Sequence, residues 1–473
     1  MIKGPILNDI TRNFTARDSL GIDGVATSIS AEICPIVNTV TPRAFYWPFM
    51  VWIYYDFYKY SGIKERNVEV FDLYLKRQDY FFVLATLINK NDELNLVGKM
   101  QAAIDLEKDG PYPFNEKYFK TRYGGMQYYN AGCILMHYII TEDPETAQKY
   151  KLPKLTKLGE EMAVAFESVI KESEYYKQYR LGNVSVPRDV LEEYGKYINI
   201  GLKGFDKCKQ LLVHSLFETK MNVTLKQSAE YLQYLSKEYN IKTLNREICR
   251  EVFYDFTTPE NRKIIIPDNL SSISKKWEIV IARQYFTTGL GLIWRFMLEQ
   301  LMRPMNIEEW IRCTILNSNF SCDKSKTVSF FLQDCNYDFN TRERLFKSTN
   351  DLENGIKVIL SVYNRLNNRA DLEEFQCYFF YGRDSQSIAL EDVFEIVNEY
   401  KEKALVDFMI YVMKKWLIEQ HYITAFEKML QNRDGFFYEY NDDLYIKKHD
   451  FKIDFQGIRM IQLMQIMKDL DML

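Results

Sequence analysis

The sequence lacks the short motifs by which many enzymes bind phosphates, metals or acyl groups. It has no GxxxxGK[ST] phosphate-binding loop and no GxSxG nucleophile elbow. Gly289 and Gly291 form a lone GxG inside an expected helix, without a preceding strand, so they do not indicate a dinucleotide site. We therefore predict no catalytic residues and no cofactor, and a non-enzymatic protein is favoured.

Histidine is scarce, and the cysteines are scattered. The 473 residues include four histidines and eight cysteines, without a CxxC pair or an HExxH motif. Because zinc sites need such ligands at close spacing, no metal site is expected. Single cysteines in helical sequence are typical of reduced, mostly buried thiols, which predicts a cytoplasmic protein.

Long apolar segments and an excess of positive charge are also missing. Residues 1–10 contain no basic stretch followed by an apolar run, so no signal peptide is expected. The longest apolar run, residues 44–55, contains Pro48 and is too short to cross a bilayer as a helix, so no membrane partner is predicted. The net charge of −4 argues against binding of a long stretch of nucleic acid. A local basic face on one side of the protein remains an alternative.

Helical periodicity is what the sequence has in abundance. The fold class we predict is mainly α, a multi-helix bundle array, with Trp277–Met302 as its strongest helix. Gly289 and Gly291 within that helix each cost about 1 kcal/mol relative to Ala, and such glycines often mark the close approach of another backbone. Thr224 is an expected N-cap for a helix over 225–239, and Ser387 is an expected N-cap after the polar turn at 381–385. Residues 141–155 are expected to be a charged linker.

The last part of the chain has a different pattern. Three short helices are expected at 390–399, 405–418 and 422–431, followed by alternating aromatic residues around Asn441-Asp442-Asp443, which predict a β-hairpin. Helices followed by a hairpin indicate a small C-terminal winged-helix-like α+β module. The predicted domains are thus an N-terminal arm with an aromatic helical domain (1–150), a central helical domain (151–385) and this module (386–473).

A winged helix would place a recognition helix near 424–433 and a wing near 440–446. Residues 427–459 hold six basic and seven acidic residues, a net charge of −1, whereas a DNA-reading wing is normally positive. A packing or protein-contact module is therefore favoured, and DNA binding is the alternative. The candidate nucleic-acid contacts are Lys428, Arg433, Lys447 and Lys448.

The N-terminal block is rich in candidate polar and aromatic interaction residues. Arg43 stands at an expected helix start, where its guanidinium can reach a carboxylate or a phosphate in a bidentate manner. The favoured interpretation is a docked arm held by a salt bridge and aromatic packing. An enzyme with a non-contiguous site, built from residues such as Arg17, Asp18, Arg43 and Asp384, is a further alternative. The full candidate set is Arg17, Asp18, Arg43, Trp47, Trp52, Arg383 and Asp384.

The two ends of the chain carry a family resemblance. Arg-Asp-x-Leu-Gly-Ile at 17–22, Asn-Thr-Val-Thr-x-Arg at 38–43 and the Trp-containing segment that follows resemble an uncharacterised bacterial family. Its members often sit near anti-phage defence and DNA-modification genes. The segment 425–429, the hairpin and Asp469-Leu470 are also similar, whereas Ser19 stands where the family more commonly has Pro. The resemblance brings no catalytic assignment.

These observations together predict a non-enzymatic helical scaffold or accessory subunit. The resemblance implies a bacterial anti-phage defence or DNA-transaction complex, with protein subunits as the main partners and DNA as a further one. A DNA-binding protein that uses the C-terminal winged helix, and an enzyme with a non-contiguous polar site, remain the alternatives.

Overall fold

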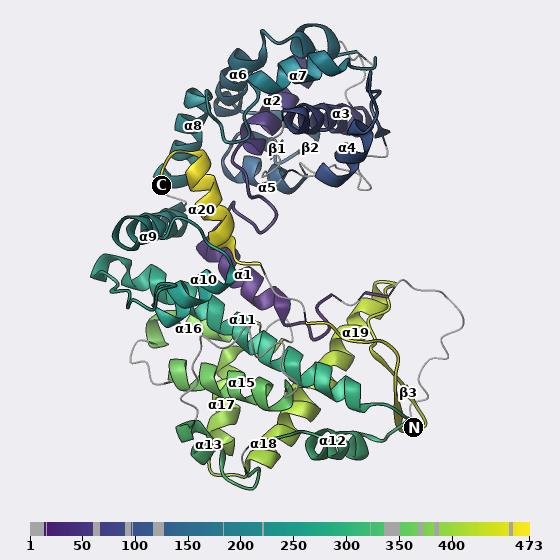
Figure 1. Ribbon diagram of the computed structural model, residues 1–473, viewed down its shortest axis with the longest axis vertical. Helices are drawn as coiled ribbons and strands as arrows, with labels where there is room; N and C mark the ends of the chain where they lie inside the picture. Colours follow the sequence, from purple (N-terminus) through teal and green to yellow (C-terminus); the bar gives the residue numbers. More distant parts are fainter. Residues whose placement is uncertain are drawn as a thin grey trace. The chain divides into compact units, whose positions relative to one another are not determined.

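A computed structural model describes residues 14–15, 17–59, 67–89, 96, 98–116, 127–182, 184–219, 222–321, 323–334, 351–367, 372–382, 387–453 and 457–473. These residues are mostly helical, with two small two-stranded sheets (Figure 1). Among them, no helix combines the length and the apolar character needed to cross a membrane.

The chain forms two compact units, and each unit is discontinuous in sequence. Unit 1 contains residues 1–30 and 247–457, and unit 2 contains residues 31–246 and 458–473. Two of the three boundaries between them fall within α1 (Asp23–Ile33) and α10 (Arg246–Arg250), and the third lies between Gly457 and Ile458. The three-part division at residues 150 and 385 stays a prediction.

Unit 2 is built around the aromatic helix α2 (Tyr46–Lys59), whose residues 46–54 are all buried. Trp47 and Trp52 are fully buried, so these two candidates belong to the core. Aromatic rings contributed by neighbouring segments fill the space beside α2, with ring centroids 4.6 Å apart for Phe45 and Phe82 and 5.1 Å apart for Phe166 and Phe205. Large flat side chains of this kind each bury a large apolar area. The remaining elements of the unit are α3 (Val68–Ile88), α4 (Lys99–Leu106), α5 (Gln127–Leu135), β1 (Ile139–Glu142), β2 (Lys149–Leu155), α6 (Lys157–Ile170), η2 (Tyr175–Tyr179), α7 (Arg188–Tyr197), α8 (Asp206–Val213), η3 (His214–Glu218), α9 (Val223–Tyr239) and α20 (Arg459–Asp469).

Two local expectations for unit 2 are wrong. Residues 141–155 were expected to be a charged linker, but β1 and β2 pair antiparallel there, with Ile139 opposite Leu155. The Thr224 side chain does not cap α9, which begins one residue earlier. Its hydroxyl donates instead to the carbonyl of Glu32 over 3.2 Å.

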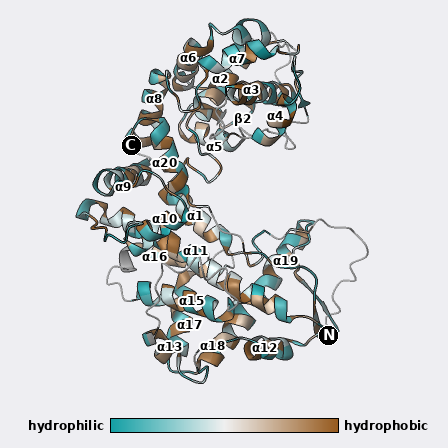
Figure 2. Ribbon diagram, viewed as in Figure 1, coloured by the Kyte–Doolittle hydropathy of each residue, from teal (hydrophilic) through white to brown (hydrophobic). Residues whose placement is uncertain are grey.

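Unit 1 is organised around α11 (Asp268–Gln300), which is buried along most of its length and in which apolar and polar residues alternate (Figure 2). Its closest partner is α15 (Asp351–Asn367). A Cβ atom added at Gly355 would lie 2.6 Å from the carbonyl oxygen of Gly289, so the predicted close approach of another backbone is confirmed at Gly289. It is wrong for Gly291, where the nearest atoms to an added Cβ are side-chain atoms of Ile453 and Phe451 at 3.8 Å. The other elements are η5 (Glu251–Asp255), α12 (Ile307–Leu316), α13 (Val328–Asp334), α16 (Leu372–Phe380), α17 (Leu390–Tyr400), α18 (Leu405–Tyr411), η8 (Val412–Glu419), α19 (Gln420–Leu430), β3 (Tyr438–Asn441) and β4 (Leu444–Lys447).

The C-terminal part of unit 1 matches the sequence prediction in part. The hairpin is present, and its turn residues Asp442 and Asp443 both have positive φ, as a tight hairpin turn requires. The two helices expected at 405–418 and 422–431 are instead one uninterrupted helical run, because α18 continues through the π-helix η8 into α19.

Candidate functional site

The candidate site in unit 1 begins with the N-terminal arm, which we define as residues 14, 15 and 17–22. The side-chain ammonium of Lys428 on α19 donates to the carbonyls of Arg17 and Asp18 over 2.6 and 2.7 Å. The Asp18 carboxylate accepts from the backbone N–H groups of Ile22 and Asp23, which begins α1. Lys428 of α19 therefore fixes the arm, and Asp18 of the arm caps the N-terminal end of α1.

His421 joins the arm to the hairpin segment from inside unit 1. Its Nδ1 lies 2.9 Å from the carbonyl oxygen of Ser19, and its Nε2 accepts from the backbone N–H of Phe437 over 3.2 Å. These two partners require a neutral ring that carries its proton on Nδ1. Burial lowers the pKa of His421 to about 4, so the ring stays neutral at physiological pH. No motif in the sequence marked this residue, because its partners are backbone groups from distant segments.

The glycine of the arm explains its close fit against α19. Gly21 has a φ of +66°, and a Cβ atom there would lie 2.7 Å from the hydroxyl oxygen of Thr424. Its carbonyl accepts from the Ser387 hydroxyl over 2.9 Å. Ser387 was expected to cap the helix that follows, but α17 begins at Leu390, so this hydroxyl holds the arm instead. Together with the bonds from Lys428 to Arg17 and Asp18, these contacts bring residues 17–22 directly against the segment 424–428.

A buried guanidinium lies on α11 in unit 1. Arg283 is fully buried, and its three side-chain nitrogens have no hydrogen-bond partner among the described residues. Burial lowers its pKa to about 9, while the carboxylates of Asp392, Asp18 and Asp23 act in the opposite direction. Thr287, one turn along α11, lines a cavity of about 40 Å³ together with Asp18, which is enough room for a water molecule.

Most of the candidate nucleic-acid contacts are engaged within the protein. Lys428 holds the arm, Lys447 pairs with Asp450 at 2.5 Å, and Lys448 pairs with Asp434 at 2.8 Å. Arg433 is exposed. The outer strand β4 is also docked, because Tyr445 and Met305 exchange two backbone hydrogen bonds of 2.7 and 3.1 Å. The hairpin is therefore packed against unit 1 along this edge.

The outer face of α19 exposes an apolar stripe, which we define as Tyr422, Ile423, Phe426 and Leu430. Their exposed fractions are 52%, 37%, 39% and 70%. The spacing i, i+1, i+4, i+8 places these side chains on one face of the helix, opposite the buried His421 and Ala425. Tyr422 and Phe426 stack on each other, with ring centroids 6.2 Å apart. Contiguous exposed apolar surface of this kind is typical of interaction sites.

Arg43 belongs to unit 2, where it is paired with Asp469 of α20. Its Nε and Nη2 donate to the two carboxylate oxygens over 2.9 and 2.8 Å, and both side chains are buried. Burial raises the pKa of Asp469, and the guanidinium opposes that shift. The bidentate carboxylate partner that the sequence allowed for Arg43 is thus Asp469, and the pair ties α20 to the start of α2.

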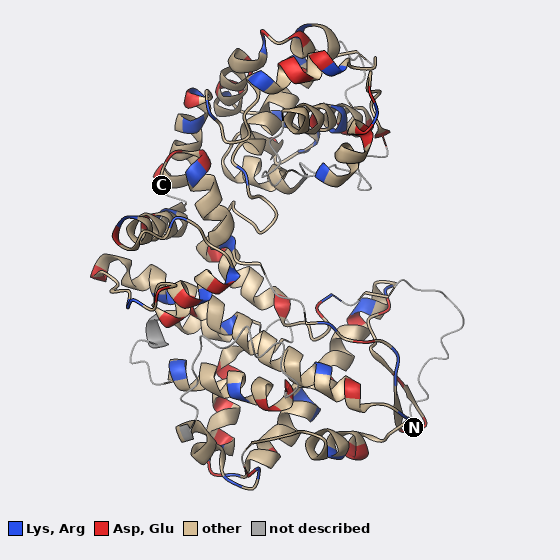
Figure 3. Cartoon of the chain, viewed as in Figure 1, with Lys and Arg blue, Asp and Glu red and all other residues tan. Residues whose placement is uncertain are grey.

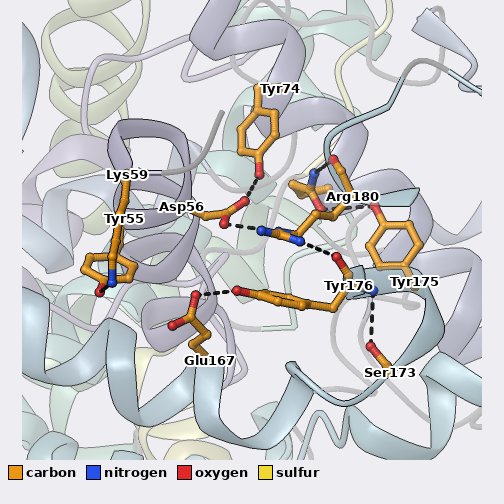
Figure 4. A network of polar contacts seen from close by, with 10 residues as sticks. Tyr55, Asp56, Lys59, Tyr74, Glu167, Ser173, Tyr175, Tyr176 and Arg180 are labelled. Carbon is orange, nitrogen blue, oxygen red and sulfur yellow. Dashed lines mark hydrogen bonds and ion pairs between the residues drawn. The ribbon is translucent and has the colours of Figure 1, made fainter. Parts of the chain in front are cut away.

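A second buried polar network of unit 2 surrounds Asp56 of α2 (Figure 4). One carboxylate oxygen accepts from the hydroxyl of Tyr74, and the other accepts from the Nε of Arg180 over 3.2 Å. The Arg180 guanidinium lies 3.8 Å from the ring centroid of Tyr176. The Tyr176 hydroxyl donates to the carboxylate of Glu167 over 2.6 Å. Burial raises the pKa of Asp56, while Tyr74 and Arg180 counteract it. Both oxygens have partners, so the network joins helices rather than presenting a free acid or base.

The remaining candidates are divided between the two units and the residues outside the description. Arg17 and Asp18 belong to unit 1 and Arg43 to unit 2, whereas Arg383 and Asp384 lie outside the described residues. Within the described part of the chain, no group of three His, Cys, Asp or Glu residues is placed to hold a metal ion. The free thiols of Cys34, Cys133, Cys208 and Cys249 are buried, as expected for those four, but Cys377 is exposed.

Comparison with known proteins found no counterpart: no family model, no curated protein and no solved structure matches the chain.

Proposed function

We propose that the chain is a non-enzymatic helical scaffold or accessory subunit that binds protein partners through the apolar stripe of α19. The observation that carries this proposal is the exposure of Tyr422, Ile423, Phe426 and Leu430 on one face of α19. Burying such side chains against a partner is favourable by about 25 cal/mol per Å² of apolar area. The resemblance of the chain ends supports a bacterial anti-phage defence or DNA-transaction complex in the cytoplasm as the setting.

Affinity purification from the native host tests this proposal. The tagged chain is compared with a Phe426→Ser, Leu430→Ser variant, each with and without nuclease. We expect stoichiometric protein partners that survive nuclease treatment and are lost with the variant. Because both side chains are exposed, the variant should keep the thermal stability of the wild type. Recovery of the chain alone, or of the same partners with the variant, contradicts the proposal.

DNA binding through a winged-helix-like C-terminal module is the second candidate. Two observations support it: the hairpin follows α19 directly, and Arg433 between them is exposed. The use of Lys428, Lys447 and Lys448 in internal contacts weighs against it. Duplex binding at low salt that is lost on Arg433→Glu would favour this candidate, because phosphate contacts dominate such affinities.

A further inference from the structure

The cap of α1 comes from a residue of the N-terminal arm, because the residue directly before the helix cannot provide one. That residue is Ile22, whose aliphatic side chain has no hydrogen-bond acceptor. The Asp18 carboxylate takes its place, since one of its oxygens accepts from the backbone N–H groups of Ile22 and Asp23 over 2.9 and 3.2 Å. The start of α1 therefore depends on a side chain that stands four residues before Ile22.

A turn over residues 18–21 brings the Asp18 carboxylate to the helix. Asp18 and Gly21 both lie in the left-handed region, with φ values of +47° and +66°, and the Asp18 carbonyl accepts from the Gly21 N–H over 3.5 Å. A left-handed conformation is unfavourable for aspartate in a free chain, so it persists where surrounding contacts impose it. Ser387 supplies one such contact, since its hydroxyl donates to the Gly21 carbonyl over 2.9 Å.

Helix α19 supplies further contacts that hold this turn. It contains one Lys or Arg, Lys428 (Figure 3). The ammonium group of Lys428 donates to the carbonyls of Arg17 and Asp18, and the Nδ1–H of His421 donates to the carbonyl of Ser19. These bonds go to backbone carbonyls, so they fix the path of the arm while the Asp18 side chain caps α1.

Helix α1 passes from unit 1 into unit 2, and the boundary lies between residues 30 and 31. Its start is capped by the arm, which belongs to unit 1. Near its other end, the carbonyl of Glu32 accepts from the hydroxyl of Thr224 on α9 in unit 2 over 3.2 Å. The two ends of α1 are therefore held independently, and the first turn can change while the last turn keeps its bond.

We propose that the arm is a latch for α1, in the sense that docking of residues 17–21 on α19 sets the order of the first turn of α1. While the arm is docked, Asp18 caps the helix. When the arm leaves α19, the turn over 18–21 loses the contacts that impose it, the cap is lost, and residues 22–26 unwind. A change at α19 is thereby passed to the helix that continues into unit 2.

Amide hydrogen exchange of the full chain, read by mass spectrometry of peptic fragments, tests this proposal. Lys428→Met removes the donors to the arm and keeps an apolar stem of similar length. We expect the amides of residues 22–26 to exchange about fivefold faster or more, the factor that corresponds to loss of a typical N-cap, whereas residues 31–33 should be unchanged. The matched control is Lys415→Met, because Lys415 pairs with Glu419 on the same helical run, and it should leave residues 22–26 unchanged.

Two further variants act on the arm itself and separate docking from capping. Asp18→Ala removes the cap and keeps the carbonyls that α19 binds, so it should speed exchange of residues 22–26 and leave the bond from the Thr15 N–H to Asp434 protected. Gly21→Ala should speed both, because its Cβ would lie 2.7 Å from the hydroxyl oxygen of Thr424. The double variant Lys428→Met, Asp18→Ala should exceed neither single variant at residues 22–26, since both act through the same turn.

Three results would overturn the latch. Unchanged exchange of residues 22–26 in both Lys428→Met and Gly21→Ala would show that α1 begins without the docked arm. Additive effects of Lys428→Met and Asp18→Ala would show that docking and capping are independent. An equal rise in exchange throughout the chain would show a general loss of stability in place of a local change at α1.

Discussion

The stability of unit 1 should depend on the protonation of His421 in a way that can be calculated from the structure. The ring is buried between the carbonyl of Ser19 and the N–H of Phe437, and its pKa is lowered from 6.5 to about 4. An added proton on Nε2 would break the bond from Phe437 and place a charge beside Trp294, whose ring centroid lies 4.9 Å away.

The sign of the effect follows from the direction of this shift. Because the folded pKa lies below the unfolded value, the unfolded chain binds more protons between pH 6.5 and about 4. The contribution of His421 is therefore fully present above pH 6.5 and is lost as the pH falls toward 4. A shift of about 2.5 units at about 1.4 kcal/mol per unit gives a loss of about 3 kcal/mol in the free energy of unfolding.

Urea unfolding of the wild type and of a His421→Asn variant, measured at intervals from pH 7.5 to pH 4, isolates this term. Carboxylates that titrate in the same range contribute equally to both proteins, so the difference between the two free energies reports His421. We expect that difference to shrink by about 3 kcal/mol from pH 7 to pH 4. A His214→Asn variant, which changes an exposed ring, is the matched control. A difference that is constant over this range refutes the argument.

Three further substitutions test the buried groups. Asp469→Asn should lower the free energy of unfolding by about 3–5 kcal/mol in urea melts, because it leaves the Arg43 guanidinium buried without its carboxylate; a loss below 1 kcal/mol contradicts this. Arg283→Met should be neutral or stabilise by about 1–3 kcal/mol, since it removes a buried charge without a hydrogen bond, and a clear destabilisation would show that Arg283 has an essential partner. Gly159→Ala should lower the free energy of unfolding by about 1–3 kcal/mol, because its Cβ would lie 2.0 Å from the carbonyl oxygen of Tyr138. The control Gly24→Ala should leave the same urea melts unchanged, because no atom lies within 4 Å of its Cβ.

The sequence determined the local elements whose signal lies within a few residues. The mainly helical fold, the long helix α11 and the hairpin around Asn441-Asp442-Asp443 follow from apolar periodicity and from turn residues that accept positive φ. Gly289 could be predicted as a point of close helix packing. A glycine inside a helix lowers the helix stability relative to alanine, and close packing of another backbone offsets that loss.

Helix caps predicted from a single residue were wrong where a distant backbone carbonyl bonded to the same hydroxyl. The hydroxyls of Thr224 and Ser387 were candidates for helix caps, yet each donates to a carbonyl far away in the chain, of Glu32 and Gly21 respectively. The strand β2 could not be predicted from the sequence, because its lysine side chains face solvent and it lacks a clear apolar pattern. It is defined by its pairing with β1.

The tertiary structure alone decided which distant segments meet and which polar residues remain free. It pairs Arg43 with Asp469 and places Lys428 and His421 under the arm, contacts that span several hundred residues of chain and leave no periodic trace in the sequence. It also pairs Lys447 with Asp450 and Lys448 with Asp434, and it leaves the apolar stripe of α19 exposed. Exposure depends on what packs against each face of a helix, and the composition of that helix does not contain this information.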